Sequence, residues 1–142
     1  MASAQHQLQA THPGQGLPES YDPERLAFAF RYYRHLARVR RYVDEHHDQP
    51  LRLREVAVSI GLSPSRLSHL FTEKVGLPFQ VWIRLERVSR ARALLSATDL
   101  SVTEVTYRVG FQSLRSFERA FKRFTGMTAL EFRRRVIASR LR

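Results

Sequence analysis

The chain has 142 residues, 43% of them hydrophobic, no cysteine, and 24 lysines and arginines against 13 acidic residues, which gives a net charge of +11. This length accommodates one ordinary domain or two very small ones, and the lack of cysteine excludes disulfides, thiolate metal sites and cysteine nucleophiles. No apolar run reaches the roughly 18–20 residues of a membrane span and the first residues lack a signal-peptide pattern, so we expect an intracellular protein with no membrane contact.

The first helix is predicted to follow an unstructured tail. Residues 1–21 are rich in Gln, His, Ala, Pro and Gly without periodicity, which indicates disorder. Asp22 as N-cap and Pro23 at the first helical position then predict one helix that continues until Pro50. Its segment "LAFAFRYY" (26–33) is apolar on more than one face, which indicates either core packing or an exposed surface for a partner or a second copy.

Two short helices joined by a glycine turn are predicted over residues 53–76. Leu53, Val56 and Ile60 have helical spacing and are followed by Gly61, which can adopt the left-handed conformation of a helix end. The second helix has a Ser-Pro start, an apolar stripe and a terminal glycine, namely Ser63, Pro64, Leu67, Leu70, Phe71 and Gly76. This arrangement is typical of a helix-turn-helix.

The same pattern recurs over residues 102–126. The first helix of the pair recurs 49 positions later, in Val102, Val105, Val109 and Gly110. The second recurs 50 positions later, in Phe117, Phe121 and Gly126. The spacing indicates a duplicated unit with a one-residue insertion, either in the turn or at the start of the second helix.

A long helix is predicted between the two copies, over residues 78–97, and its part 79–96 would span roughly 27 Å. Neighbouring major grooves on one face of B-DNA repeat about every 34 Å, so such a helix could present two reading heads to successive grooves. After the second copy we expect a short closing helix and a basic C-terminal tail, 136–142. The chain is therefore predicted to be all-α, with about seven helices and one DNA-binding domain over 22–135.

The basic residues provide the candidate sites. Residues 1–24 contain no lysine or arginine, so the positive charge lies on the predicted folded part. It favours a polyanionic partner, nucleic acid first and an acidic membrane surface or acidic protein second; a merely solvated basic surface is the alternative. Base-reading candidates are the outward residues of the two second helices: Ser65, Arg66, Ser68 and His69, then Leu114, Arg115, Ser116 and Arg119. Phosphate-contacting candidates are Ser63, Lys74, Arg84, Arg90, Lys122 and Arg123, with Arg133–Arg135 beside them.

Catalytic and metal-binding patterns are weak in this sequence. The "DEHHD" cluster (44–48) holds His46 and His47, which as neighbours on a helix point about 100° apart. Their place before Pro50 favours a helix C-terminus rather than a metal site. With no phosphate-binding glycine loop and no nucleophile-base pair, we expect no enzyme activity, no metal and no cofactor.

Two long segments carry a family resemblance: "LRLREVAVSIGLSPSRLSHLFTEKVGLPFQVWIRLERVSRARALL" and "LSVTEVTYRVGFQSLRSFERAFKRFTGMTALEFR". Residues 36–135 resemble the DNA-binding domain of AraC/XylS-type bacterial transcription regulators. The resemblance implies two helix-turn-helix subdomains joined by a long helix, and monomeric reading of an asymmetric site. It also implies activation by contact with RNA polymerase, in a cytoplasmic, nucleoid-associated protein. The family's base-reading places fall on Ser65, Ser68 and His69 and on Leu114, Arg115, Ser116 and Arg119.

The chain departs from the family pattern in three ways. Ala129 stands where the family usually has proline, the residues before 36 are too few for the sensor domain of many members, and the lack of cysteine excludes the alkyl-DNA repair of some relatives. Control by abundance, by a partner or through 26–33 is therefore expected. Dimerisation through 22–35 is an alternative to the monomer, and a basic adaptor protein that binds RNA polymerase or another regulator, with only incidental DNA binding, is the alternative function.

Overall fold

The computed structural model describes residues 16–142, which form eight α-helices and no strand within that range. The described chain is therefore all-α, as the sequence predicts. Residues 1–15 of the tail expected over 1–21 lie outside the described residues. In the described remainder, Tyr21 closes a turn by donating its backbone N–H to Pro18 O at 2.8 Å. None of the helices in the described range is long and apolar enough to cross a membrane.

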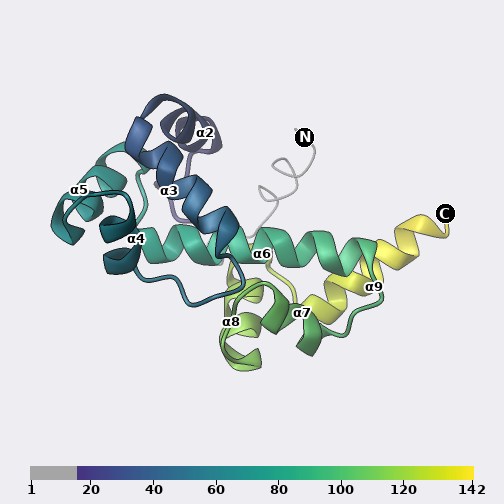
Figure 1. Cartoon of the computed structure of the whole chain (residues 1–142). Coiled ribbons are helices and arrows are strands. Elements are labelled where there is room, and N and C mark those ends of the chain that lie inside the picture. The colour runs from purple at the N-terminus through teal and green to yellow at the C-terminus, as the bar shows by residue number, and fades with distance from the viewer. Residues whose placement is uncertain (1–15) are drawn as a thin grey trace. The chain divides into compact units, whose positions relative to one another are not determined.

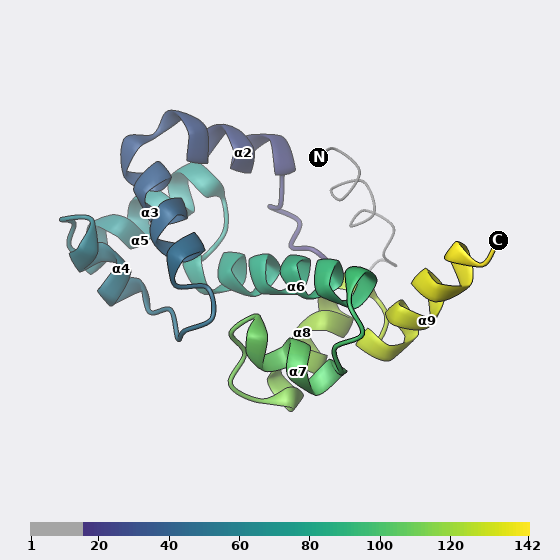
Figure 2. The same ribbon diagram turned by 45° about the vertical axis from the view of Figure 1, so that its right-hand side comes forward.

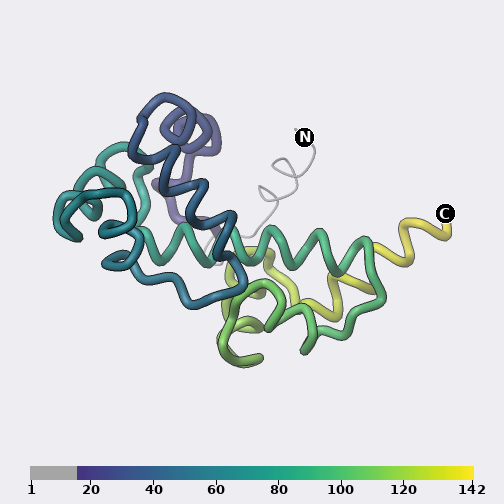
Figure 3. The backbone as a smooth tube through the Cα atoms, viewed as in Figure 1, coloured from purple at the N-terminus to yellow at the C-terminus, as the bar shows by residue number. Residues whose placement is uncertain are grey.

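Two compact units make up the described fold, Pro18–Ile83 and Arg84–Arg142. The first unit contains α2 (Pro23–Tyr32), α3 (Arg34–Glu45), α4 (Leu53–Ser59), α5 (Pro64–Val75) and the start of α6 (Phe79–Ala97). The second contains the rest of α6, α7 (Val102–Arg108), α8 (Leu114–Thr125) and α9 (Ala129–Arg140). Figure 1 labels all eight helices, and Figure 3 traces the same path as a backbone tube.

The single helix predicted from Asp22 to Pro50 is wrong, because the chain breaks at Tyr33 into α2 and α3. Tyr33 has an extended backbone, with φ −88° and ψ 117°. A straight helix presents one face to the body, whereas "LAFAFRYY" is apolar on more than one face. The break lets α2 fold back over α3 and α5, so that Ala29 becomes buried. This division accounts for eight helices where the sequence predicts about seven.

An aromatic cluster forms the core of the first unit. Trp82 is fully buried, and its ring centroid lies 4.7 Å from Phe30, 5.3 Å from Phe71 and 6.0 Å from Phe79. The apolar stripes of α3, α4 and α5 pack around it, with Leu36, Val39, Val43, Val56, Leu67 and Phe71 almost completely buried. Leu70, which belongs to the predicted apolar stripe of α5, is only half-buried.

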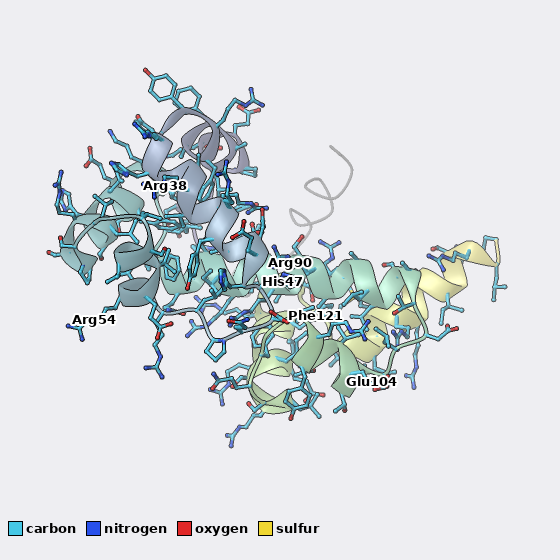
Figure 4. All side chains as sticks on the ribbon, viewed as in Figure 1. Arg38, His47, Arg54, Arg90, Glu104 and Phe121 are labelled. Carbon is cyan, nitrogen blue, oxygen red and sulfur yellow. The ribbon has the colours of Figure 1, made fainter. Side chains whose placement is uncertain are left out.

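The second unit is built on the phenylalanines of α8. Phe117, Phe121 and Phe124 are completely buried, and Phe121 lies 5.7 Å from Phe132 of α9. Figure 4 labels Phe121 among these packed helices. The α6 residues Leu85, Val88, Ala91 and Leu95 complete this core. The alternating Arg-Phe sequence of this segment is therefore a helix with one aromatic face and one basic face.

The closing helix begins at Ala129 despite the missing proline. Thr128 caps it, accepting from the backbone amide of Glu131 at 3.1 Å, while its own amide donates to the Glu131 carboxylate at 2.9 Å. This reciprocal capping box satisfies the backbone amides of Thr128 and Glu131, so the helix starts without a proline. α9 continues to Arg140, so it takes in most of the segment 136–142 that was expected as a tail.

Candidate nucleic-acid interface

The second helix of each pair is held at both ends by the same chemistry. The N-cap serines Ser63 and Ser113 each accept a hydrogen bond from the backbone amide of the third helical residue, at 3.2 and 3.1 Å. Gly76 and Gly126 end the helices in the left-handed conformation, at φ 82° and 77°. α5 and α8 are both twelve residues long. The sequence repeat is thus a repeat of backbone geometry.

The extra residue of the second copy lies in the turn. Leu62 donates its amide to Ala57 O at 2.9 Å, and Phe111 donates to Thr106 O at 3.1 Å, which makes Leu62 and Phe111 equivalent. The N-cap serine follows Leu62 directly but follows Phe111 after one further residue, Gln112. Gln112 is exposed. Both helix pairs therefore keep their core register, and the two turns differ in length.

The candidate base-reading residues of α5, the second helix of the first helix-turn-helix, are exposed and polar. Ser65, Arg66, Ser68 and His69 are all exposed, whereas the α5 stripe that includes Leu67 is buried. His69 Nε2 lies 3.8 Å from a Glu73 carboxylate oxygen one turn further on. An exposed i,i+4 contact of this kind is weak, so it leaves His69 available to a ligand.

A groove of about 480 Å³ runs beside this face. Its lining residues are His35, Leu62, Ser65, Arg66, His69, Leu70 and Glu73. Half-buried Leu62 and Leu70 form the apolar part, and the exposed polar side chains form the rim. The first helix-turn-helix thus has a groove beside the exposed face of α5.

In the second helix-turn-helix, α8 carries two arginines one turn apart. Arg115 and Arg119 are exposed, and within residues 16–142 neither guanidinium takes part in an ion pair or hydrogen bond. Ser116 is exposed but tied to the cap, because its hydroxyl oxygen accepts from Ser113 Oγ at 2.9 Å. Leu114 is half-buried. An arginine with all its donors available can bind guanine O6 and N7 bidentately, so Arg115 and Arg119 remain candidates for this contact.

The candidate phosphate contacts differ in their availability. Arg84, Lys122 and Arg123 are exposed, and Arg123 lies 5.4 Å from the ring centroid of Phe124. Arg90 is half-buried. Lys122 and Arg123 occupy the last turn of α8, where positive charge complements the helix dipole. The Ser63 hydroxyl already accepts the cap hydrogen bond, which leaves its proton to donate.

Lys74 is half-buried and engaged with its neighbours. Its ammonium lies 3.2 Å from a Glu73 oxygen and 4.9 Å from the ring centroid of Tyr33. The hydrogen bond to Glu73, followed by the attraction of that carboxylate, raises the pKa of Lys74 above its ordinary value. A phosphate that approaches Lys74 must compete with Glu73.

Several arginines stabilise the fold through hydrogen bonds to distant carbonyls, a role that their sequence positions do not reveal. Arg25 donates to Glu73 O at 2.5 Å and Lys74 O at 3.2 Å, at the C-terminal end of α5. Arg133 does the same for α6, donating to Leu95 O at 3.4 Å and Thr98 O at 3.3 Å. These bonds join residues 35 to 49 positions apart, so a local sequence pattern does not predict them. Arg133 is one of the candidate phosphate contacts Arg133–Arg135, but its guanidinium already donates hydrogen bonds to these two carbonyls.

Burial distinguishes two further arginines. Arg87 lies 5.8 Å from the ring centroid of Phe111, and Arg92 lies 5.3 Å from that of Phe132. Burial lowers the pKa of Arg92, and burial followed by repulsion from Arg90 lowers that of Arg87. The positive charge of the chain is consequently not all at its surface. Arg87 and Arg92 are partly buried, whereas Arg115 and Arg119 of α8 are exposed.

The histidine pair of the "DEHHD" cluster closes a helix. His46 Nδ1 is 2.8 Å from Tyr42 O and His47 Nδ1 is 3.0 Å from Asp44 O, so each ring nitrogen donates to a carbonyl of the last turn of α3. Figure 4 labels His47 near this helix end. Across the described part of the chain, no group of three or more His, Asp or Glu side chains is placed to hold a metal ion.

Comparison with known proteins adds independent information. Residues 56–135 match a family model described as a helix-turn-helix domain. The arabinose operon regulatory protein of Escherichia coli K12 is 40% identical over 93 residues, which cover 65% of this chain and 32% of that protein. The same protein of Salmonella typhimurium LT2 matches equally well, with 33% of its length covered. The chain thus spans about a third of the length of these curated relatives.

Solved structures show the same fold. The C-terminal domain of AraT, a response regulator from Geobacillus stearothermophilus, superposes with a TM-score of 0.70 at 31% identity, covering 73% of this chain and 87% of that one. The DNA-binding domain of AdpA, a global transcriptional factor in complex with a target DNA, gives a TM-score of 0.71 at 27% identity. That match covers 75% of this chain and 96% of the AdpA chain.

Proposed function

Because this chain belongs to the AraC-type family of DNA-binding helix-turn-helix transcription regulators, we propose that it reads a specific duplex site with both α5 and α8, each in a major groove. The repeated caps and glycines support this, since they present both helices in the same way. The matched relatives are named as transcription regulators and not as enzymes.

The single observation that carries the proposal is the pair of unengaged arginines on α8. Arg115 and Arg119 lie one turn apart on the exposed face opposite the buried phenylalanines. Each arginine that pairs with a guanine contributes about 1–3 kcal/mol of discrimination against the wrong base. The serines and His69 of α5 offer weaker contacts, so we expect a site with one strongly read half and one weakly read half.

Around these base contacts, we assign phosphate contacts to Ser63, Lys74, Arg84, Arg90, Lys122 and Arg123. Such contacts supply affinity without sequence information. With six to ten of them, affinity falls by roughly 10³–10⁵ between 50 and 200 mM salt. A basic adaptor protein with incidental DNA binding would also show a salt-dependent loss, but it would enrich no common sequence from a random duplex library.

The test begins with duplexes selected by the protein from such a library. On the selected site, Arg115→Ala and Arg119→Ala should each cost about 1–3 kcal/mol of binding free energy while changing affinity for random duplex little. Arg84→Ala is the matched control, since it removes an exposed arginine of α6 and should weaken both duplexes alike. Equal losses on both duplexes for the α8 variants would show that these arginines do not read bases.

The direction of regulation is a separate part of the proposal. We propose that a bound copy activates transcription by contacting RNA polymerase, as the family resemblance implies. Transcription from a template carrying the selected site upstream of a promoter, with purified polymerase, should rise when the protein is added. A fall in transcript would identify a repressor and overturn this part while leaving the DNA-binding proposal intact.

A further inference from the structure

Helix α2 divides sharply into two faces. Its inward face packs on the first unit through buried Ala29 and through Phe30, whose ring centroid lies 4.7 Å from Trp82 and 6.0 Å from Phe71. In Figure 2, α2 lies across the top of α3 and α5. The opposite face is turned away from the unit, and its five residues are all exposed: Glu24, Ala27, Phe28, Arg31 and Tyr32. We call these five residues the outer face of α2.

Two large aromatic rings lie side by side on the outer face. Phe28 is 55% exposed and Tyr32 is 69% exposed, and their rings stack at 5.1 Å with an interplanar angle of 13°. Tyr33 packs edge-on against both rings, at 6.4 and 5.1 Å. Adjacent exposed aromatic rings are the kind of surface that marks an interaction site.

The outer face is presented from a fixed helix. Asp22 caps α2, accepting from the amides of Glu24 and Arg25 at 3.0 and 3.2 Å. The Arg25 guanidinium binds two carbonyls at the end of α5, and Lys74 of α5 lies over the Tyr33 ring at 4.9 Å. A partner therefore meets a surface that needs little ordering on binding, which lowers the entropic cost of association.

The charges of the outer face have opposite signs at its two ends. Glu24 lies in the first turn of α2 and Arg31 in the last turn. Within the described residues 16–142, neither side chain forms an ion pair. The two residues are seven positions apart, which is about two turns or 10.5 Å along the axis. This arrangement is complementary to itself when a second α2 runs in the opposite direction.

We propose that the outer face of α2 binds a second copy of this chain, in an antiparallel two-fold pairing that places Glu24 of each copy opposite Arg31 of the other. The register that pairs these charges also places Ala27 opposite Phe28, so that each phenylalanine ring lies over a small side chain. Both pairings follow from one axis between residues 27 and 28, as an isologous contact requires.

The contact is small, so the free dimer is weak. Two ten-residue helices bury less than the roughly 1,200–2,000 Å² of a standard stable interface. A weak dimer becomes important when two copies are held close together, because their effective concentration then reaches the millimolar range. If the proposed DNA reading is correct, the pairing makes two adjacent sites bind cooperatively; the pairing itself needs no DNA.

The test uses charge reversal in the full chain without DNA. Glu24→Arg alone and Arg31→Glu alone each create two like-charge pairs in the homodimer, so each variant should self-associate at least tenfold more weakly than wild type. An equal mixture of the two variants restores both opposite-charge pairs, so it should associate like wild type. Sedimentation equilibrium up to about 1 mM covers the affinity expected for a contact of this size.

Several outcomes would overturn the proposal. A wild-type chain that stays monomeric up to that concentration rules it out, and so does a mixture that associates no better than its components. The Trp82 emission spectrum checks that each variant remains folded, since Trp82 is the only tryptophan and is fully buried beneath α2. Because no duplex is present, failure here leaves the DNA-reading proposal untouched.

A crosslinking experiment tests the register independently. The chain has no cysteine, so Ala27→Cys introduces one thiol beside the proposed axis. A short bismaleimide should join two Ala27→Cys chains efficiently. Exposed Ser89→Cys on α6 is the matched control and should give only background crosslinking. Equal yields from the two variants would mean that the outer face of α2 is not the contact.

Discussion

Replacing Phe121 with alanine should strongly destabilise the second unit and leave the stability of the first unit unchanged. The Phe121 side chain is completely buried, with its ring 5.5 Å from Phe117 and 5.7 Å from Phe132. Truncating such a side chain costs about 3–5 kcal/mol, the lost transfer free energy plus the cavity. A unit of roughly 60 residues has a stability of about 3–9 kcal/mol. The substitution therefore removes most of the stability of that unit.

The repeat supplies a matched control in Phe71, fifty positions earlier. Phe71 is also completely buried, and its ring lies 5.3 Å from Trp82 in the first unit. Tryptophan emission therefore reports the first unit alone, whereas far-ultraviolet circular dichroism reports both. In urea titrations, Phe121→Ala should lower the dichroism midpoint and leave the emission midpoint at its wild-type value, and Phe71→Ala should lower the emission midpoint.

The reasoning is refuted if Phe121→Ala lowers both midpoints together. That result would mean that the two units unfold as one cooperative body, so that damage to one core is shared by the other. Phe121→Leu refines the test, because it removes less volume and should shift the dichroism midpoint less than alanine does.

Two further predictions concern backbone conformation and pH. Gly61→Ala and Gly76→Ala both strain a left-handed residue by about 1–2 kcal/mol, but the methyl group at Gly76 also lies 3.0 Å from Arg25 Nη1, while that at Gly61 meets open space. Thermal unfolding should show the larger loss for Gly76→Ala, and Arg25→Ala should reduce the difference, since only Ser20 O, at 3.4 Å, then remains close to the added methyl group; a difference that does not shrink refutes the close contact with Arg25. Hydrogen bonds from the Ser101 amide and hydroxyl lower the pKa of Glu104 below its ordinary 4.5. Glu104 therefore stabilises α7 above its ordinary pKa, and the melting-temperature advantage of wild type over Glu104→Gln should disappear as the pH falls through the lowered pKa; an advantage unchanged in acid refutes the assignment.

Helix ends were the features most readily predicted from the sequence. Ser63 with Pro64 begins α5, Gly76 ends it, and Gly126 ends α8. These signals work because an N-cap hydroxyl and a left-handed glycine act on amides and carbonyls within one turn of themselves. The repeat was readable for the same reason, since the apolar stripes keep their helical spacing in both copies. The location of the inserted residue was left open until the two turn hydrogen bonds placed it at Gln112.

The first helix is where local reasoning failed. Asp22 and Pro23 correctly predict where α2 begins, but nothing in the local pattern forces the break at Tyr33. The break depends on where Phe30 finds partners, and those partners, Phe71 and Trp82, lie 41 and 52 positions later in the chain. "LAFAFRYY" was expected to be either core or exposed surface. It is both, because one face of α2 lies in the core and the other is exposed.

The sequence by itself determined that this chain is helical, duplicated, basic and built to present two capped helices, because each of those properties follows from spacing, caps and charge within a few residues. Only the tertiary structure decided which arginines are available. Arg25 and Arg133 bind carbonyls far away in the chain, whereas Arg115 and Arg119 remain exposed on α8. In a sequence all four are equivalent cations, and a guanidinium acquires its role from the carbonyls that folding brings within reach.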